Sequence, residues 1–173
     1  MAVLAVILLG ACVSGSSQPV APSSRPTPTL RADIPAAAQP VTGGCGRTQA
    51  YQGPIPAWLE RADGHNTPRG LPWVVGEPSS AAGFIFGYPL RAGHPSDPTN
   101  KVLWVVRTPR NGTALEIVAH PLGSSSPLLR EQHPADSSPG EIYPDGMDVP
   151  TPGCWHFQLS WATGRAELDL EYV

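Results

Sequence analysis

The end of the chain carries two runs in which apolar and polar residues alternate. Residues 154–161 place an apolar side chain at every second position, and residues 166–172 repeat the pattern. A period of two is typical of a β-strand with one buried face, because successive side chains point to opposite sides of the backbone. The two runs therefore predict a hairpin with one apolar face and one polar face.

The residues between these runs set the expected register of the hairpin. With a two-residue turn at Thr163-Gly164, Trp161 lies opposite Ala166, and each apolar residue of one strand meets an apolar residue of the other. On the polar face this register pairs His156 with Glu171. A slip by one residue would mix the two faces, so the pattern favours this pairing. Thr-Gly is a weaker turn signal than Asn-Gly, which leaves a longer loop open.

Other apolar runs predict the remaining strands. They lie at residues 71–75, 82–88 and 101–108, with shorter candidates at 126–130 and 141–143. The run at 101–108 is apolar on both faces, as in a central strand. Pro72 places the first run at a sheet edge or limits it to a short strand. A proline-broken stretch precedes these runs and favours a short helical turn at residues 56–61.

The pair Asn111-Gly112 is the strongest local signal in the chain, because it is typical of two-residue hairpin turns. It predicts a hairpin in which Arg107 pairs with Glu116, so that opposite charges face each other. About seven short strands and no long helix predict an all-β fold, an antiparallel immunoglobulin-like β-sandwich. A small closed barrel is the alternative.

The composition supports a turn-rich β protein. The 173 residues include 18 glycines and 22 prolines, a proportion that long helices do not tolerate. The net charge is −3 and Lys101 is the only lysine, so no basic surface is available to neutralise a phosphate backbone. We therefore expect no nucleic-acid partner.

The first residues predict export and lipid attachment. An apolar run at residues 1–11, too short to span a bilayer, is followed directly by Cys12. Leu-Gly-Ala-Cys at residues 9–12 resembles a bacterial lipobox, where the cysteine is acylated and the preceding peptide is removed. The missing Lys or Arg before the run departs from that pattern, and an ordinary signal peptide or a buried apolar segment is the alternative. We expect Cys12 to anchor the protein to the cell membrane on its extracytoplasmic face.

The segment after the lipobox predicts a tether. Residues 13–43 are rich in Ser, Pro, Ala and Thr and cannot bury enough apolar surface to fold, so we expect a disordered linker before a domain at 44–173. Cys45 and Cys154 are then the one cysteine pair of an exported chain, which predicts a disulfide. A redox-active thiol or a metal ligand is the alternative, although Cys-x-x-Cys spacing is absent.

Long catalytic motifs are absent from the sequence. There is no Gly-x-Ser-x-Gly, no phosphate-binding loop, no His-Glu-x-x-His and no dinucleotide fingerprint. Of the five histidines, only His156 has an expected partner, Glu171, and a solvated cross-strand contact explains that pair. Asp145-Gly-Met-Asp148 with Glu141 could form a loose calcium loop, but Pro-Asp-Gly is also an ordinary turn sequence. We expect no catalytic residue, no metal and no cofactor.

Tryptophans are the remaining candidates for a binding surface. Exposed aromatic rings can stack on sugars, and most of the five tryptophans lie in strand runs that should be core. Only Trp58, with Tyr51 nearby, is a candidate surface platform, and core or edge packing is the favoured interpretation even there.

Four segments carry a resemblance to a known group of proteins. They are residues 87–93, 100–107, 139–144 and 150–155, the last ending in Pro-Gly-Cys-Trp. Together they resemble the uncharacterised secreted lipoproteins of high-GC, actinobacteria-type bacteria, whose chains end in a Pro-Gly-Cys-Trp strand and hairpin. The resemblance spans residues 71–173, and it implies the sandwich and the compartment but no activity.

These observations lead to one expected function and two alternatives. We expect a lipid-anchored, non-enzymatic module that binds an unknown envelope protein or glycan. A carbohydrate-binding module is the first alternative. A hydrolase with a scattered active site is the second, although no paired catalytic group can be named.

Overall fold

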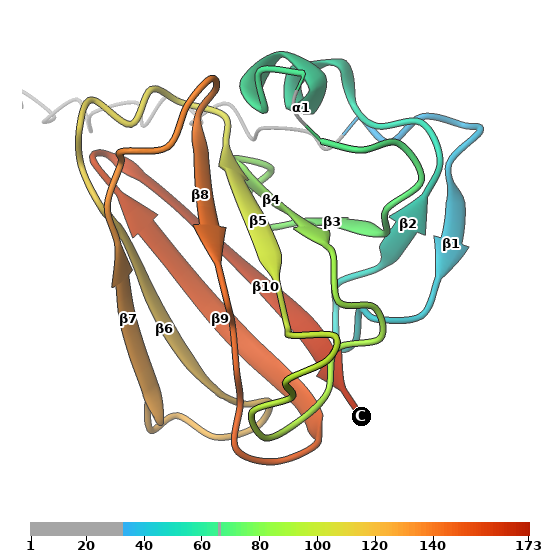
Figure 1. Ribbon diagram of the computed structural model, residues 1–173, viewed down its shortest axis with the longest axis vertical. Coiled ribbons are helices and arrows are strands. Elements are labelled where there is room, and N and C mark those ends of the chain that lie inside the picture. The colour runs from blue at the N-terminus through green and yellow to red at the C-terminus, as the bar shows by residue number, and fades with distance from the viewer. Residues whose placement is uncertain (1–32, 66) are drawn as a thin grey trace, which may run out of the picture.

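The computed structural model describes residues 33–65 and 67–173, which form ten strands and one short helix (Figure 1). The helix is α1 (Ala57–Ala62). The strands are β1 (Gln39–Val41), β2 (Ala50–Gln52), β3 (Trp73–Val75), β4 (Ala81–Ile85), β5 (Val102–Val106), β6 (Leu115–Pro121), β7 (Leu129–His133), β8 (Ile142–Asp145), β9 (Gly153–Trp161) and β10 (Gly164–Tyr172). The expected signal peptide and Cys12 lie outside the described residues, as does the linker up to residue 32.

The strands form two antiparallel sheets that pack face to face (Figure 1). One sheet has six strands in the order β1-β2-β3-β4-β5-β8, and the other has four in the order β10-β9-β6-β7. The expected all-β sandwich is therefore confirmed, with ten strands among the described residues instead of about seven. The likeness to an immunoglobulin domain is limited to this two-layer architecture. The strand order is a separate feature, since five consecutive strands form a meander across the larger sheet.

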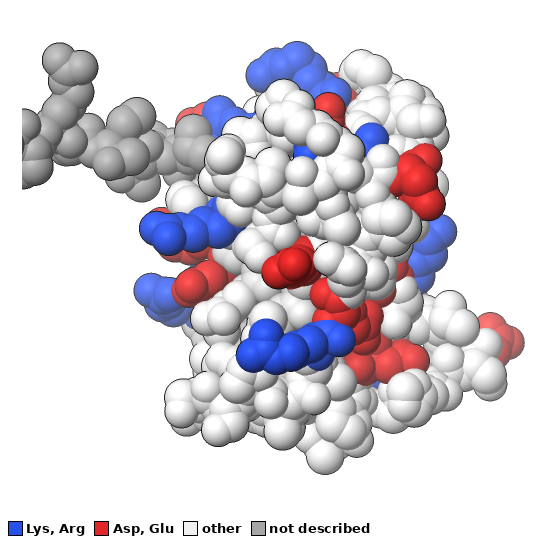
Figure 2. Space-filling view, turned by 90° about the vertical axis from the view of Figure 1, so that its left-hand side faces the viewer, with Lys and Arg blue, Asp and Glu red and all other residues white. Residues whose placement is uncertain are grey.

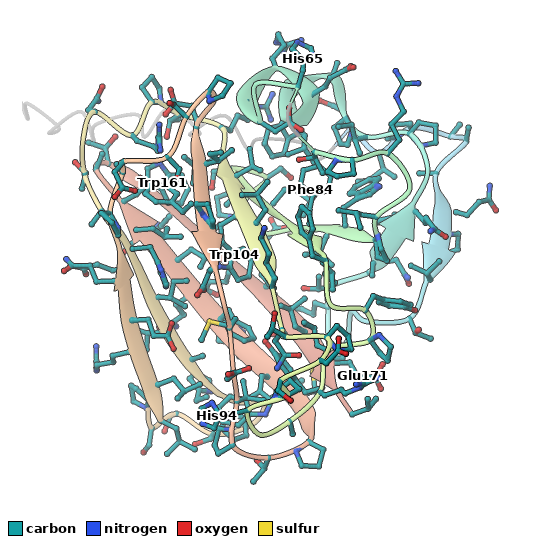
Figure 3. The ribbon with its side chains drawn as sticks, in the orientation of Figure 1. His65, Phe84, His94, Trp104, Trp161 and Glu171 are labelled. Carbon is teal, nitrogen blue, oxygen red and sulfur yellow. A yellow bond between two sulfur atoms is a disulfide. The ribbon has the colours of Figure 1, made fainter. Side chains whose placement is uncertain are left out.

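The central strands of the six-stranded sheet are buried on both faces. All five residues of β4 and all five of β5 are buried. Trp104 faces the four-stranded sheet and tilts against Phe157, whereas Phe84 lies in a second apolar cluster that includes α1 (Figure 3). This second cover explains why the run at 101–108 is apolar on both faces, and β5 is indeed a central strand.

The terminal hairpin has the expected faces in a shifted register. Trp161 pairs with Gly164 and Leu159 pairs with Ala166, so the turn is Ala162-Thr163 and the predicted pairing of Trp161 with Ala166 is wrong. The shift is two residues, which leaves every apolar side chain on the buried face because the strand period is also two. Ala162, the first residue of this two-residue turn, adopts a positive φ of 39°.

The Asn111-Gly112 turn forms, but the strands beside it do not pair. Both residues have positive φ, and Thr113 N donates to the Arg110 carbonyl over 2.9 Å, as in a tight two-residue turn. However, β5 pairs with β4 and β8, and β6 pairs with β7 and β9 in the other sheet. The predicted pairing of Arg107 with Glu116 is therefore wrong, because this turn carries the chain from one sheet to the other.

Most of the smaller expectations are confirmed with adjusted bounds. The helical turn forms as α1, and β3, β4, β7 and β8 lie in or beside the predicted runs. β3 is limited to three residues after Pro72 and lies between β2 and β4, so it is short but not at an edge. β1 was not predicted and falls within the last residues of the 13–43 segment, so the folded part begins before residue 44.

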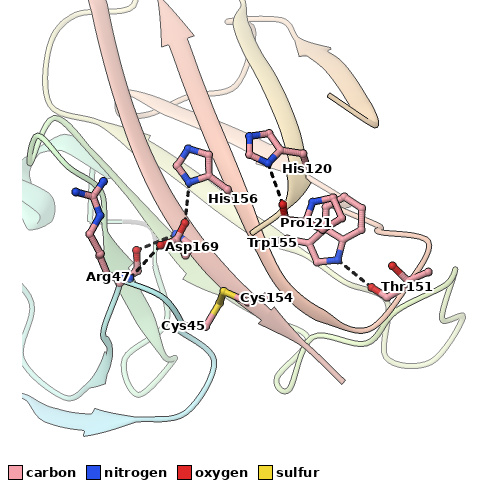
Figure 4. Close-up of a disulfide and its surroundings, with 10 residues drawn as sticks. Cys45, Arg47, His120, Pro121, Thr151, Cys154, Trp155, His156 and Asp169 are labelled. Carbon is pink, nitrogen blue, oxygen red and sulfur yellow. Dashed lines mark hydrogen bonds and ion pairs between the residues drawn. A yellow bond between two sulfur atoms is a disulfide. The ribbon is translucent and has the colours of Figure 1, made fainter. Parts of the chain in front are cut away.

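The disulfide between Cys45 and Cys154 is present and holds the start of the domain to its end (Figure 4). The segment before β2 lies along β10, where Cys45 N donates to Asp169 O over 3.3 Å and Glu171 N donates to Gly43 O over 3.0 Å. Arg47 N also donates to Asp169 Oδ2 over 3.0 Å. The outer edge of β10 is thus covered by backbone and side-chain hydrogen bonds, which protects it from pairing with another chain.

Candidate functional site

Trp58 is not a surface platform. Its side chain is 4% exposed and packs, with Leu59 of the same helix, on the outer face of the six-stranded sheet. The Arg107 guanidinium lies 5.3 Å from the centre of its ring and adds a cation–π contact. Tyr51 is half-buried and stacks on Trp73 with 5.0 Å between the ring centres. Both aromatic rings therefore serve packing, and the expected sugar-binding surface is absent at this place.

A hollow lies beside α1, at the outer face of the larger sheet. It is a pocket of about 510 Å³. Apolar side chains that line it are Ile55, Leu71 and Phe84, and polar ones are Glu60, Asp63, His65, Thr67 and Arg69, with Gly53, Pro54, Pro68 and Gly70 completing the wall. Figure 3 shows His65 at the helix end and Phe84 below it on the sheet. The pocket has the volume of a typical small-molecule site.

Local backbone chemistry shapes one wall of this pocket. Pro56 precedes α1, and its carbonyl accepts hydrogen bonds from Leu59 N over 2.9 Å and Glu60 N over 3.1 Å. Proline suits this position because the first helical turn needs no donor from it. After the helix, Asp63 Oδ1 accepts a hydrogen bond from His65 N over 2.7 Å, which turns the chain outward with His65 at a φ of 59°.

The loop that follows α1 is held at both ends by hydrogen bonds from the larger sheet and its connections. Glu141 N donates to the Ala62 carbonyl over 2.6 Å, and the Gln52 side chain donates to the Gly70 carbonyl over 2.6 Å. The Thr67 hydroxyl lies between these anchors, is fully buried and has no hydrogen-bond partner. A buried hydroxyl without a partner costs free energy, but this oxygen is closed off from the pocket, so a ligand reaches it only if the loop moves.

The pocket does not contain a recognisable catalytic arrangement among the described residues. His65 is 71% exposed and its Nδ1 lies 3.9 Å from Glu60 Oε1, a distance too long for a hydrogen bond. No described side chain bonds to the Thr67 hydroxyl, so no base activates it as a nucleophile. The geometry therefore fits binding of a ligand better than its chemical conversion.

The histidine pairing expected from the sequence is corrected by the register shift. His156 Nδ1 lies 2.7 Å from Asp169 Oδ1, and its Nε2 lies 3.7 Å from Glu167 Oε2 (Figure 4). The predicted pair with Glu171 is therefore wrong. The His120 ring lies 5.1 Å from the His156 ring on the neighbouring strand, so this is a cross-strand polar cluster on the outer face of the smaller sheet.

The calcium loop is not assembled. Asp145 is the last residue of β8, and Glu141 instead pairs with Arg110 at 3.3 Å. Asp145 meets His133 and Glu131, which belong to β7. Glu131 and His133 are two apart in a strand and so share a face, which is a signal present in the sequence. Their third partner comes from another sheet and could not be predicted from spacing.

No helix of the described residues has the length and apolar character needed to cross a membrane. Comparisons of the chain with models of protein families, with curated proteins and with solved structures find no match.

Proposed function

We propose that the chain is a lipid-anchored, extracytoplasmic binding protein whose folded domain takes a small organic ligand in the pocket beside α1. The observation that carries this proposal is the pocket itself, which combines the apolar side chains of Ile55, Leu71 and Phe84 with polar side chains in the same wall. A ligand with an apolar body and one hydrogen-bonding group would match this lining. Arg69 at the wall can donate to an accepting group on the ligand, and Glu60 and Asp63 stand in the same wall as acceptors.

The membrane anchor in this proposal rests on the sequence at residues 9–12. A domain tied by one long-range disulfide fits an oxidising compartment outside the cytoplasm. Substitution Cys12→Ser should release the protein from isolated membranes into the soluble fraction, because acylation requires the thiol. Unchanged membrane fractionation would contradict the anchor and leave the pocket proposal standing.

Ligand binding can be tested with anilinonaphthalene sulfonate, a fluorescent probe that has an apolar body and one anionic group. We expect the native protein to bind the probe at one site. Leu71→Trp adds an indole ring to the pocket floor and should weaken binding at least about 10-fold, which is about 1.4 kcal/mol. Near-ultraviolet circular dichroism of each protein confirms that the probe reports a folded state.

Leu128→Trp is the matched control for this experiment. Leu128 is 59% exposed and is not among the residues that line the pocket, so the same substitution there should leave probe affinity unchanged. Equal affinities for the Leu71→Trp protein and the native protein would contradict the proposal. If Leu71→Trp weakens probe binding as expected, native mass spectrometry of the protein isolated from its own envelope would identify the natural ligand by its mass.

A further inference from the structure

A histidine and two carboxylates converge where the edges of the two sheets meet. His133 Nε2 lies 3.3 Å from Glu131 Oε2 and 3.2 Å from Asp145 Oδ1. The three ligand atoms lie within 4.8 Å of one another. Glu131 and His133 belong to β7, the edge of the four-stranded sheet, whereas Asp145 ends β8, the edge of the six-stranded sheet. The cluster thus joins the facing edges of the two sheets.

The Nε2 atom of His133 lies within this cluster but forms no hydrogen bond with either carboxylate. His133 Nε2 is fully buried and makes no hydrogen bond, although two carboxylate oxygens lie within ion-pair distance. A straight hydrogen bond would be acceptable at these separations, so the Nε2 axis does not point at either oxygen. A buried ring nitrogen in this state lacks the partner that such groups ordinarily have.

Among the described residues, no Lys or Arg forms an ion pair with Glu131 or Asp145. The Asp145 side chain is 1% exposed, and the ion pairs recorded for Glu131 and Asp145 in the described residues involve only His133. Asp148 lies nearby and pairs with His94 at 2.9 Å, again without Lys or Arg. Figure 2, which views the molecule from the side of β7, shows a group of acidic side chains on this face with a basic side chain beside it. Buried carboxylates without a cation are costly, so the place favours a positive ion.

Two of the three atom separations match the coordination sphere of zinc, and the third is at most 4.8 Å. Tetrahedral ligands at bond lengths of about 2.0–2.1 Å stand roughly 3.3 Å from one another. The distances of 3.2 and 3.3 Å around His133 Nε2 agree with that value. One imidazole with two carboxylates suits Zn²⁺ and related transition-metal ions, whereas Ca²⁺ and Mg²⁺ prefer oxygen ligands alone.

The second oxygen of Asp145 is already positioned by the core. Trp104 Nε1 donates to Asp145 Oδ2 over 3.0 Å, in a buried contact. This bond leaves Oδ1 facing His133 and orients the carboxylate as outer-sphere partners do in metal sites. From this geometry we propose that Glu131, His133 and Asp145 bind one divalent transition-metal ion of the Zn²⁺ class. The fourth position is open to water or to a ligand atom from outside the chain.

An ion at this place would close the sandwich at its second edge. The disulfide and the hydrogen bonds of β10 already close the opposite edge. A metal that bridges β7 and β8 would tie the two sheets together in the folded state and stabilise it by mass action. This inference is independent of the pocket beside α1, which lies on the outer face of the larger sheet.

Calorimetry can test the proposal directly. The full chain with Cys12→Ser, which removes the free thiol as a competing ligand, is stripped with chelator and titrated with ZnSO₄. We expect one Zn²⁺ per chain. Substitutions His133→Ala and Glu131→Gln should each weaken binding by more than the roughly 10–100-fold typical for loss of an outer-sphere partner. Titration with Co²⁺ should give the intense visible absorption of a four-coordinate ion, and both variants should lose it.

His156→Ala is the matched control. His156 is a half-buried strand histidine beside two carboxylates, like His133. Its two carboxylates lie at different ring nitrogens, Asp169 at Nδ1 and Glu167 at Nε2, so the three side chains do not form a metal-binding group. Its removal should leave the Zn²⁺ stoichiometry and affinity unchanged. Absence of one-to-one binding, retention of binding by the folded His133→Ala and Glu131→Gln proteins, or equal loss in His156→Ala would each overturn the proposal.

Discussion

Removal of the disulfide is the perturbation whose magnitude follows most directly from the structure. Cys45 and Cys154 are separated by 109 residues, so their bond restricts nearly the whole described domain in the unfolded state. In the chain-entropy treatment a closed loop of this length contributes about 4.8 kcal/mol at 25 °C. The double substitution Cys45→Ala and Cys154→Ala should therefore lower the free energy of unfolding by about that amount.

The fold itself should survive this change. The segment that carries Cys45 remains bound to β10 by the backbone bond from Glu171 N to Gly43 O, at 3.0 Å. Asp169 N also donates to Thr48 Oγ1 over 2.8 Å. Each such bond contributes about 1 kcal/mol, so the native position of the segment does not depend on the sulfur atoms alone. The loss should thus arise mainly from the greater freedom of the unfolded chain.

Urea unfolding of the oxidised native protein and of the double variant measures the effect. With a slope of about 2 kcal/mol per molar urea, the midpoint should fall by about 2.4 M. Native protein treated with reductant is the control and should unfold at the midpoint of the variant. A loss of less than about 1 kcal/mol would refute the reasoning, because the cross-link would then restrict little of the unfolded chain.

Two further predictions concern backbone packing and alkaline pH. A Cβ at Gly87 would stand 2.2 Å from the Thr99 carbonyl oxygen, so Gly87→Ala should lower the free energy of unfolding by more than about 2 kcal/mol in the same urea assay. Gly146→Ala is the control, because a Cβ there has its nearest contact at 3.7 Å and should change stability little. Equal effects of the two substitutions would contradict this packing argument. Burial raises the pKa of Tyr172 well above its ordinary value of 10, and nearby carboxylates add to the shift. Because the folded state keeps this proton longer than the unfolded state, stability should be full below about pH 10 and fall above it. Tyr172→Phe should lessen that fall, measured by urea midpoints on either side of pH 10, and an unchanged fall would show that other groups cause it.

The alternation of apolar and polar side chains correctly predicted which faces of the main strands are buried. The faces of β9 and β10 follow directly from their alternation, and the both-faced apolar run of β5 indicated a strand covered on two sides. The disulfide was predicted because setting Cys12 aside as an expected lipidation site leaves one cysteine pair. These features depend on local periodicity and composition, which the sequence carries in full.

The sequence predicted the strand register and the pairing of strands less well. The pairing of β9 with β10 shifted by two residues, because such a shift changes no face and so has no signature in the pattern. Asn111-Gly112 made its turn but connected two different sheets, since a turn motif specifies a local chain reversal and not the pairing beyond it. Trp58 became core because α1 covers the outer face of the six-stranded sheet, a contact between distant segments.

The sequence by itself determined the all-β class, the buried faces of the main strands and the cysteine pair, because each is set by local alternation or by residue count. Only the tertiary structure decided which strands share a sheet and what covers the outer face of β4. It alone also brought Asp145 to Glu131 and His133. These features arise from contacts between residues far apart in the chain, and such contacts depend on how the layers close on each other.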